Sequence, residues 1–288
     1  MRQLKLPDGS TMPVLGLGTW RMGEASTTRD AEVANLRTAL TLGYRLIDTA
    51  EMYGEGGAET VVGRALAEAL RAGEVRREDI TIVSKVYPHN ASRHGTVTAC
   101  GRSLQRLGLD QIDLYLLHWR GSHPLAETVE AMQSLTDAGK IRCWGVSNLD
   151  VDDMRELDTL TSPLPPERRC ATNQVYYSLT ERGAEFSLLP WMRERAMPLM
   201  AYSPIDQGSL ADNAALATLG EARGLSAAQI ALAWVVNQPG VVAIPKASSA
   251  RHLQANLAAE RVSLSEQELR LIDERFHPPK KKTRLSMI

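Results

Sequence analysis

Four side chains whose types and spacing could move a proton follow apolar, β-branched segments of the chain. Asp48, Lys85 and His118 each end such a segment, and Tyr53 lies five residues after Asp48. A buried lysine needs a partner of opposite charge, so we expect Lys85 to pair with Asp48. The positive charge would lower the pKa of the Tyr53 phenol, ordinarily about 10, toward the range in which a proton donor works near neutral pH.

This set of groups suits the conversion of an aldehyde or ketone to an alcohol. Tyr53 would give a proton to the carbonyl oxygen while His118 holds that oxygen by a hydrogen bond. The carbonyl carbon must receive a hydride, which no side chain donates, so this chemistry implies a nicotinamide cofactor. A Schiff-base aldolase would instead use Lys85 as its nucleophile, but a lysine paired with Asp48 stays protonated and unreactive.

The elements that must position these residues form a repeat. Apolar, β-branched segments begin near residues 15, 44, 80, 112, 141, 171, 199 and 242, which is the spacing of successive strand–helix units. Residues 58–70 have the apolar periodicity of a helix, as do residues 213–223 and 226–237 in the long last interval. Ser265 and Glu268 predict a capping box that opens a terminal helix. Residues 4–12 read as a hairpin with Pro-Asp-Gly at its turn, which would plug one end of the structure.

Eight strand–helix units in 288 residues predict an α/β fold, a single (β/α)8 TIM barrel over residues 1–288 with an N-terminal β-hairpin and extra helices. The rival is a doubly wound sheet, which usually has a third glycine in the turn after its first strand. The sequence GLGTW at residues 16–20 has only two. In a barrel the carboxyl ends of the strands share one rim, so polar residues that end seven strands would gather at one site.

Composition restricts the class of protein further. The chain has 33 basic and 34 acidic residues and a net charge of −1, which argues against a nucleic-acid-binding protein. The longest apolar run, residues 230–236, is too short to span a membrane, and the first eight residues lack the apolar core of a signal peptide. Cys100, Cys143 and Cys170 have no CxxC spacing, so they indicate neither a disulfide framework nor a metal site. We expect a cytoplasmic monomer that binds neither nucleic acid nor membrane.

The residues above lie in short motifs that resemble, in order and spacing, those of the aldo-keto reductase family over essentially the whole chain. The motifs are GLGTW (16–20), IDTAEMYG (47–54), VSK (83–85), DLYLLHW (113–119), GVSN (145–148), NQV (173–175), YSP (202–204) and IPK (244–246). The tail PPKKKTR (278–284) resembles that of bacterial members that reduce methylglyoxal and similar small aldehydes. The resemblance implies a catalytic tetrad in which Tyr53 is the acid, Lys85 and Asp48 tune it, and His118 orients the carbonyl group.

The resemblance also implies how the nicotinamide end and the pyrophosphate of the cofactor are held. Ser147, Asn148 and Gln174 would hydrogen-bond the carboxamide. Tyr202 would stack on the nicotinamide ring, and Ser203 and Leu210 would approach the pyrophosphate.

At the adenosine end the resemblance implies NADPH rather than NADH, because Lys246 would pair with the 2′-phosphate. Many members have an arginine six residues after this lysine, but here position 252 is His and is preceded by Arg251. Either Lys246 and Ser248 suffice, or Arg251 reaches the phosphate. Asn256 would contact the adenine.

Aromatic residues after three strands predict the substrate pocket. Trp20, Tyr87 and Trp119 would form an apolar wall over the nicotinamide. The loop after His118 is short, which predicts a shallow pocket for small carbonyl compounds, and we interpret the basic tail at residues 280–284 as solvated. The function indicated is an NADPH-dependent reductase of small aldehydes and ketones such as methylglyoxal. The alternative is a cofactor-binding regulatory module that acts through a protein partner.

Overall fold

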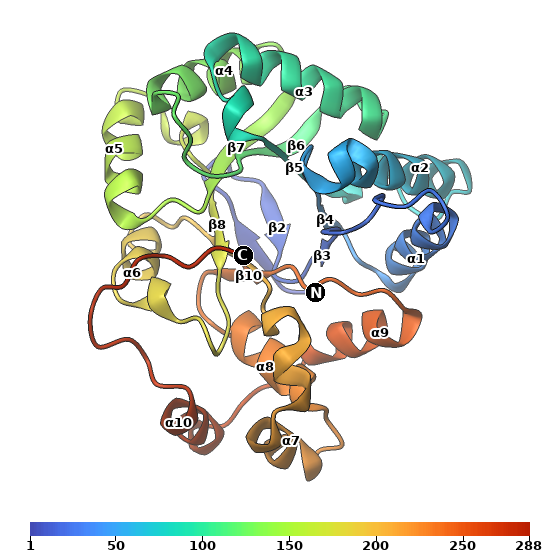
Figure 1. Ribbon diagram of the computed structural model, residues 1–288, viewed down its shortest axis with the longest axis vertical. Coiled ribbons are helices and arrows are strands. Elements are labelled where there is room, and N and C mark those ends of the chain that lie inside the picture. Colours follow the sequence, from blue (N-terminus) through green and yellow to red (C-terminus); the bar gives the residue numbers. More distant parts are fainter.

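A computed structural model describes all 288 residues, and a parallel eight-stranded barrel lies at its centre (Figure 1). The strands neighbour one another in chain order. A parallel bridge between Leu15 and Ala243, with a 2.8 Å hydrogen bond from Gly16 N to Ala243 O, joins the first strand to the last and closes the barrel. The predicted (β/α)8 barrel is therefore confirmed. Its strands are β3 (Leu17–Gly18), β4 (Leu46–Asp48), β5 (Thr81–Val86), β6 (Ile112–Leu117), β7 (Ile141–Ser147), β8 (Asn173–Tyr176), β9 (Leu199–Tyr202) and β10 (Val241–Ala243).

Helices surround the barrel because each parallel strand needs a crossover to reach the next. Each strand starts within two residues of its predicted position, and the predicted helices at residues 58–70, 213–223 and 226–237 are present. The capping box of Ser265 and Glu268 opens the last helix. The helices are α1 (Arg29–Leu42), α2 (Gly57–Arg71), α3 (Arg93–Leu107), α4 (Leu125–Asp137), α5 (Val151–Thr161), α6 (Leu188–Arg193), α7 (Ala214–Glu221), α8 (Ala227–Val236), α9 (Ala250–Ala259) and α10 (Glu266–Arg275).

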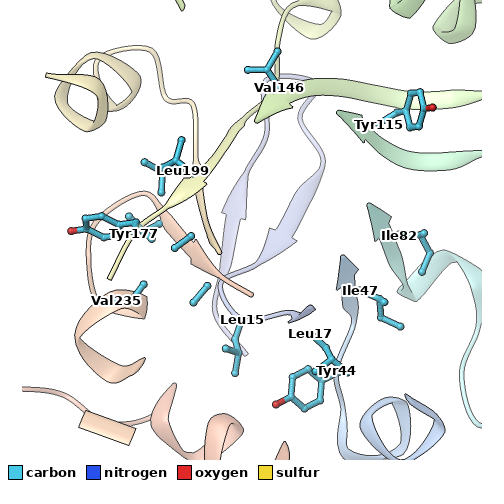
Figure 2. Packing of buried hydrophobic residues seen from close by; sticks show 14 of the residues in the cluster. Leu15, Leu17, Tyr44, Ile47, Ile82, Tyr115, Val146, Tyr177, Leu199 and Val235 are labelled. Atoms are coloured by element: carbon cyan, nitrogen blue, oxygen red, sulfur yellow. The ribbon is translucent and has the colours of Figure 1, made fainter. Parts of the chain in front are cut away.

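The hydrophobic core has two layers, one on each side of the barrel wall. The outer layer of 65 buried residues lies between strands and helices, and Figure 2 shows members such as Ile47, Ile82 and Tyr115 on successive strands. The inner layer of 11 residues fills the barrel and includes Leu6 and Met12. These two come from the hairpin of β1 (Gln3–Lys5) and β2 (Thr11–Pro13), which plugs one end of the barrel as predicted. The other end is left for polar side chains.

Strand alternation determines which polar residues enter the barrel. Side chains along a strand point to opposite faces in turn. Val83 belongs to the inner layer, so two residues later Lys85 also points inward, whereas Ser84 between them faces the helices. Leu46 likewise precedes the inward-facing Asp48 by two positions. The ends of β4 and β5 thus deliver the polar side chains of Asp48 and Lys85 to the open rim.

The chain after α10 returns to the barrel, and its end lies near the middle of the view in Figure 1. Lys282 Nζ lies 2.7 Å from Asp152 Oδ2 and 3.4 Å from Asp150 Oδ2, at the start of α5. Leu285 packs on the outer core layer, and the Ser286 hydroxyl donates to Glu181 at 2.6 Å. Residues 280–284 are exposed, as expected of a solvated tail, but the ion pairs of Lys282 and the contacts of Leu285 and Ser286 dock this end of the chain onto the rim.

None of the helices is long and apolar enough to cross a membrane. The three cysteines are free and buried, and burial raises the pKa of each thiol to about 12. No group of three or more acidic, histidine or cysteine side chains is arranged to hold a metal ion.

Candidate active site

A buried ion pair lies at the open rim of the barrel. Lys85 is 0 % exposed and its Nζ lies 2.7 Å from Asp48 Oδ2. The same ammonium donates to the Thr49 carbonyl at 2.8 Å and to the Tyr53 hydroxyl oxygen at 3.4 Å. Burial lowers the pKa of Lys85, while the Asp48 carboxylate acts in the opposite direction and supports the charge. The predicted pairing of Lys85 with Asp48 is thus present, and it leaves one lysine proton directed at the tyrosine.

Tyr53 and His118 stand beside this pair. Tyr53 opens the short 3-10 helix Tyr53–Gly56, which leads into α2, and His118 follows β6. Their rings meet edge to face with centroids 5.6 Å apart. Burial, reinforced by the charge of Lys85, lowers the pKa of His118 well below its usual value, so the imidazole is neutral. Its Nδ1 is buried without a hydrogen-bond partner, which is the state expected of a group that meets a bound molecule.

One expectation about Tyr53 is wrong. Lys85 was expected to lower the pKa of the phenol, but burial, with the negative charge of Asp48 added, raises that pKa well above its usual value. The hydroxyl therefore holds its proton at neutral pH. The lysine can still act once the proton has left, because the resulting phenolate would lie beside the ammonium.

Amide and hydroxyl side chains from β8 and from the ends of β7 and β9 extend this polar network across the cleft floor. Gln174 Nε2 donates to Asp48 Oδ1 at 2.7 Å, and the Ser147 hydroxyl donates to the Gln174 carbonyl at 2.8 Å. Asn148 Nδ2 donates to the Ser147 hydroxyl at 3.1 Å, and Tyr202 donates to Asn148 Oδ1 at 2.9 Å. All four line one cleft with the tetrad residues Asp48, Tyr53 and His118. The link from Gln174 to Asp48 was not anticipated from sequence.

The cleft has a volume of about 670 Å³ and an aromatic wall beside the tetrad. Trp20 and Trp119 line it as predicted, whereas Tyr87 does not and instead packs against Trp119 with centroids 5.0 Å apart. The docked tail adds Met287 and Ile288 to the lining. The end of the chain therefore forms part of the pocket lining, which the prediction of a short rim did not include.

Basic and hydroxyl side chains also line the cleft. Lys246, Ser248 and Arg21 are among its lining residues, together with His252. Arg251 does not line the cleft and is exposed. His252, six residues after Lys246, lines the cleft together with Lys246 and Ser248, whereas the neighbouring Arg251 side chain does not.

Of the remaining predicted cofactor residues, one lines the cleft and two do not. Ser203 lines the cleft, whereas Leu210 is 2 % exposed and packs in the outer core layer. Asn256 is 8 % exposed and turns toward the hydroxyl of Tyr44, outside the cleft lining. The side chains of Leu210 and Asn256 therefore do not face the cleft in this structure.

The residues present fit an elongated, phosphate-bearing cofactor. Amide groups lie next to Asp48, and the cationic side chains of Lys246 and Arg21 line the same cleft. Among the lining residues the backbone is left-handed at Ser203 (φ 48°), Gln207 (φ 51°) and Gly208 (φ 100°), as it is at Asn148 (φ 58°). Such conformations in non-glycine residues cluster at functional sites, and turns of this kind direct N–H groups at anions.

Several lining residues were missed by the sequence analysis. Arg21 has its guanidinium 4.5 Å from the centroid of the Trp20 ring, and its position directly after that predicted residue could have identified it. No local pattern could have identified Met287 or Ile288, because the end of the chain is held at the cleft by contacts of Lys282, Leu285 and Ser286 with residues distant in sequence.

Comparisons with known proteins agree with this site and fold. The sequence profile of the Aldo/keto reductase family matches residues 14–275. The chain is 50 % identical over 283 residues to methylglyoxal reductase YeaE of Escherichia coli (strain K12), with 96 % of each chain covered. It is 34 % identical to glyoxal reductase of Bacillus subtilis (strain 168) over 94 % of this chain and 91 % of that protein. A crystal structure of an aldo-keto reductase from Klebsiella pneumoniae in complex with NADPH has a TM-score of 0.91 at 45 % identity, covering 100 % of this chain and 99 % of that one. The chain belongs to the aldo/keto reductase family.

Proposed function

We propose that the protein is an NADPH-dependent reductase that converts small aldehydes and ketones, methylglyoxal among them, to alcohols with Tyr53 as the proton donor. The observation that carries this proposal is the buried ammonium of Lys85, 2.7 Å from the Asp48 carboxylate and 3.4 Å from the Tyr53 hydroxyl oxygen, at the floor of a cleft that bears amide groups. Such an ammonium stabilises negative charge on the phenol oxygen at the moment the proton leaves.

The roles of the side chains follow from their protonation states. The carbonyl oxygen of the substrate would accept hydrogen bonds from Tyr53 and from the neutral imidazole of His118. Bound NADPH would supply a hydride to the carbonyl carbon. Tyr53, which keeps its proton at neutral pH, gives that proton to the oxygen, and the O–H bond of the alcohol forms as the phenol O–H bond breaks. Lys85 then faces a phenolate, and Asp48 with Gln174 keeps the lysine charged and in position.

The dimensions and lining of the cleft support a small carbonyl substrate. Trp20, Trp119 and Met52 give an apolar wall, and Met287 and Ile288 of the docked tail narrow the side. In small-molecule sites apolar walls surround the ligand, and a few placed polar groups fix its orientation. The relative in Escherichia coli is a methylglyoxal reductase, which supports the same substrate class for this chain.

The basic residues of the cleft support NADPH over NADH. A 2′-phosphate adds negative charge, and charge-assisted hydrogen bonds are about twice as strong as neutral ones. Lys246 and Arg21 supply the cations, Ser248 a hydroxyl donor and His252 an imidazole. The crystallised relative from Klebsiella pneumoniae is a complex with NADPH.

The proposal is tested by following the near-ultraviolet absorbance of NADPH, and separately of NADH, with the wild-type protein and methylglyoxal. We expect a rapid loss of the NADPH signal and a slower loss with NADH. Binding of NADPH without any loss of absorbance would contradict the proposal and favour a regulatory module that acts through a protein partner.

Removing the charge of Lys246 should change cofactor preference. In Lys246→Gln we expect the Kd of NADPH to rise about tenfold, since one charge-assisted contact contributes about 1.5 kcal/mol, and the Kd of NADH to stay within about twofold. Fluorescence titration with both cofactors measures this. Lys140→Gln, which removes a lysine outside the cleft, is the matched control and should bind both as the wild type does. An equal loss of affinity for NADPH and NADH would show that Lys246 does not recognise the 2′-phosphate.

We further propose that the protein acts as a cytoplasmic monomer on a free small molecule. Its net charge of −1 gives no electrostatic footprint for nucleic acid, and its free, buried thiols suit a reducing compartment. Size-exclusion chromatography with light scattering should give a mass near 31.6 kDa.

A further inference from the structure

A second buried charge lies behind the catalytic lysine, outside the cleft. Glu59, in the first turn of α2, is 0 % exposed. Its Oε1 accepts a 2.5 Å hydrogen bond from the hydroxyl of Ser84, the residue before Lys85 on β5, and its Oε2 accepts one of 2.6 Å from Arg106 Nε on α3. Glu59 therefore ties helix α2 to the strand that carries the lysine and to the next helix. The Ser84 side chain leaves the strand on the helix side, so the contact is made through the barrel wall.

The same cluster also holds the segment that carries Tyr53. Gly56 ends the 3-10 helix that Tyr53 begins, with φ 89°, and a Cβ at Gly56 would lie 2.6 Å from Arg106 Nε. The guanidinium thus packs directly on the backbone of this segment. A few residues later, a Cβ at Gly63 would lie 2.6 Å from the Arg106 carbonyl oxygen, so α2 and α3 approach closely at this point. Bulk here would push the tyrosine segment away from β5.

We propose that Glu59 is a positioning residue for the reduction: with Arg106 and Ser84 it fixes the Tyr53 segment against β5 and supplies a second negative charge behind Lys85. The inference rests on the proposed function, because it concerns the geometry and charge of the same lysine. A buried carboxylate is costly unless it is paired and hydrogen-bonded, and both requirements are met here.

The groups that face Lys85 determine how the carboxylate of Glu59 affects the protonation of the lysine. Asp48 from β4 supports the ammonium, and so does Glu59 from α2, while burial opposes it. Tyr53 lies at 3.4 Å, and His118 after β6 is neutral. A lysine that is wholly buried depends on the sum of nearby negative charges to keep its proton. Loss of either carboxylate should therefore lower the pKa of Lys85.

The groups on the far side of Glu59 leave Arg106 as the only cation bonded to it. Cys100 on α3 and Tyr115 on β6 lie close enough for the carboxylate to raise the pKa of both, although burial is the larger cause, and both stay neutral. Glu51, which also acts on Cys100 and Tyr115, is itself paired with Arg102. Removal of the Arg106 charge should therefore expose Lys85 to a stronger field from Glu59.

The test is the pH dependence of kcat for methylglyoxal reduction at saturating NADPH. In Glu59→Gln we expect kcat at neutral pH to fall about three- to tenfold, because the tyrosine and lysine lose alignment. We also expect the fall of kcat at alkaline pH, the alkaline limb of the pH profile, to begin about 0.5 to 1 pH unit lower than in the wild type. The cause is that a missing negative charge lets Lys85 lose its proton at lower pH. In Arg106→Gln, which leaves the carboxylate without its cation, the limb should move to higher pH. This second variant covers the case in which Glu59→Gln fails to fold.

Asp113→Asn is the matched control. Asp113 is also a largely buried acid paired with an arginine, with Oδ2 2.7 Å from Arg77, but it lies at the start of β6, at the opposite end of the barrel. Its replacement should lower stability and leave the alkaline limb where the wild type has it. If Glu59→Gln or Arg106→Gln leaves the limb at the control's position, the proposed role of Glu59 is overturned although the proposed function stands. A wild-type protein that binds NADPH but does not reduce the aldehyde overturns both.

Discussion

Tyr53→Phe should lower kcat for aldehyde reduction by about 10³-fold and leave the Kd of NADPH within about twofold of the wild-type value. A positioned general acid contributes about 10²- to 10⁴-fold, and the phenol is the one hydroxyl in contact with the buried ammonium. The ring is retained, so the edge-to-face contact with His118 and the apolar surface of the cleft persist. Stopped-flow absorbance measures turnover, and fluorescence quenching measures cofactor binding.

Tyr177→Phe is the control for this change. Tyr177 is buried and donates to Glu185 at 2.7 Å, away from the cleft, so loss of its hydroxyl should cost about 1 kcal/mol of stability and leave kcat unchanged. Turnover by Tyr53→Phe at the wild-type rate would mean that the proton comes from another group, and the assignment of the tyrosine would fail.

Lys85→Met should remove activity and also destabilise the fold. Methionine matches the length of the lysine stem but leaves the Asp48 carboxylate, whose side chain is 3 % exposed, with Gln174 as its remaining side-chain partner. Breaking a buried pair in this way costs about 3–5 kcal/mol. Without the ammonium, the phenolate of Tyr53 would form unsupported, so we expect kcat to fall by about 10³-fold or more. Denaturant unfolding and NADPH consumption measure the two effects separately.

The stability loss in Lys85→Met should depend on pH with a defined sign. An unpaired buried carboxylate has a raised pKa in the folded state, so it penalises folding at neutral pH and less as the pH falls and the group takes a proton. The deficit should therefore shrink from pH 7 toward pH 5. Adding Asp48→Asn to Lys85→Met should recover most of the stability at pH 7 without recovering activity. If the double variant is as unstable as the single one, the cause is packing rather than the orphaned charge.

The proximity of the four tetrad residues could be predicted because strands that follow one another in the chain are also neighbours in the barrel. Asp48, Lys85 and His118 follow strands that are neighbours in both sequence and space, so finding the strand ends was enough to bring the side chains together. The alternation of side chains along β4 and β5 then fixed which of them point inward. Tyr53 was predicted from its short distance to Asp48, over which the chain has little freedom.

What could not be predicted depends on contacts distant in sequence or on burial. The docking of the tail rests on ion pairs of Lys282 with α5, about 130 positions away along the chain. Tyr87 does not line the cleft as predicted, because its direction is set by local packing against Trp119 rather than by proximity to a strand end. The pKa shift of Tyr53 was predicted in the wrong direction, because the cost of burying a phenolate outweighs the attraction of one ammonium.

The most direct test of the central claim is the fate of the hydride when the wild-type protein reduces methylglyoxal with NADPH deuterated at the transferable position of the nicotinamide. The account predicts one deuterium on the carbinol carbon of the product, seen by proton NMR as the loss of one proton's intensity at that carbon, with the hydroxyl proton drawn from solvent through Tyr53. A product without deuterium at that carbon, or bound NADPH that is never consumed, would contradict it.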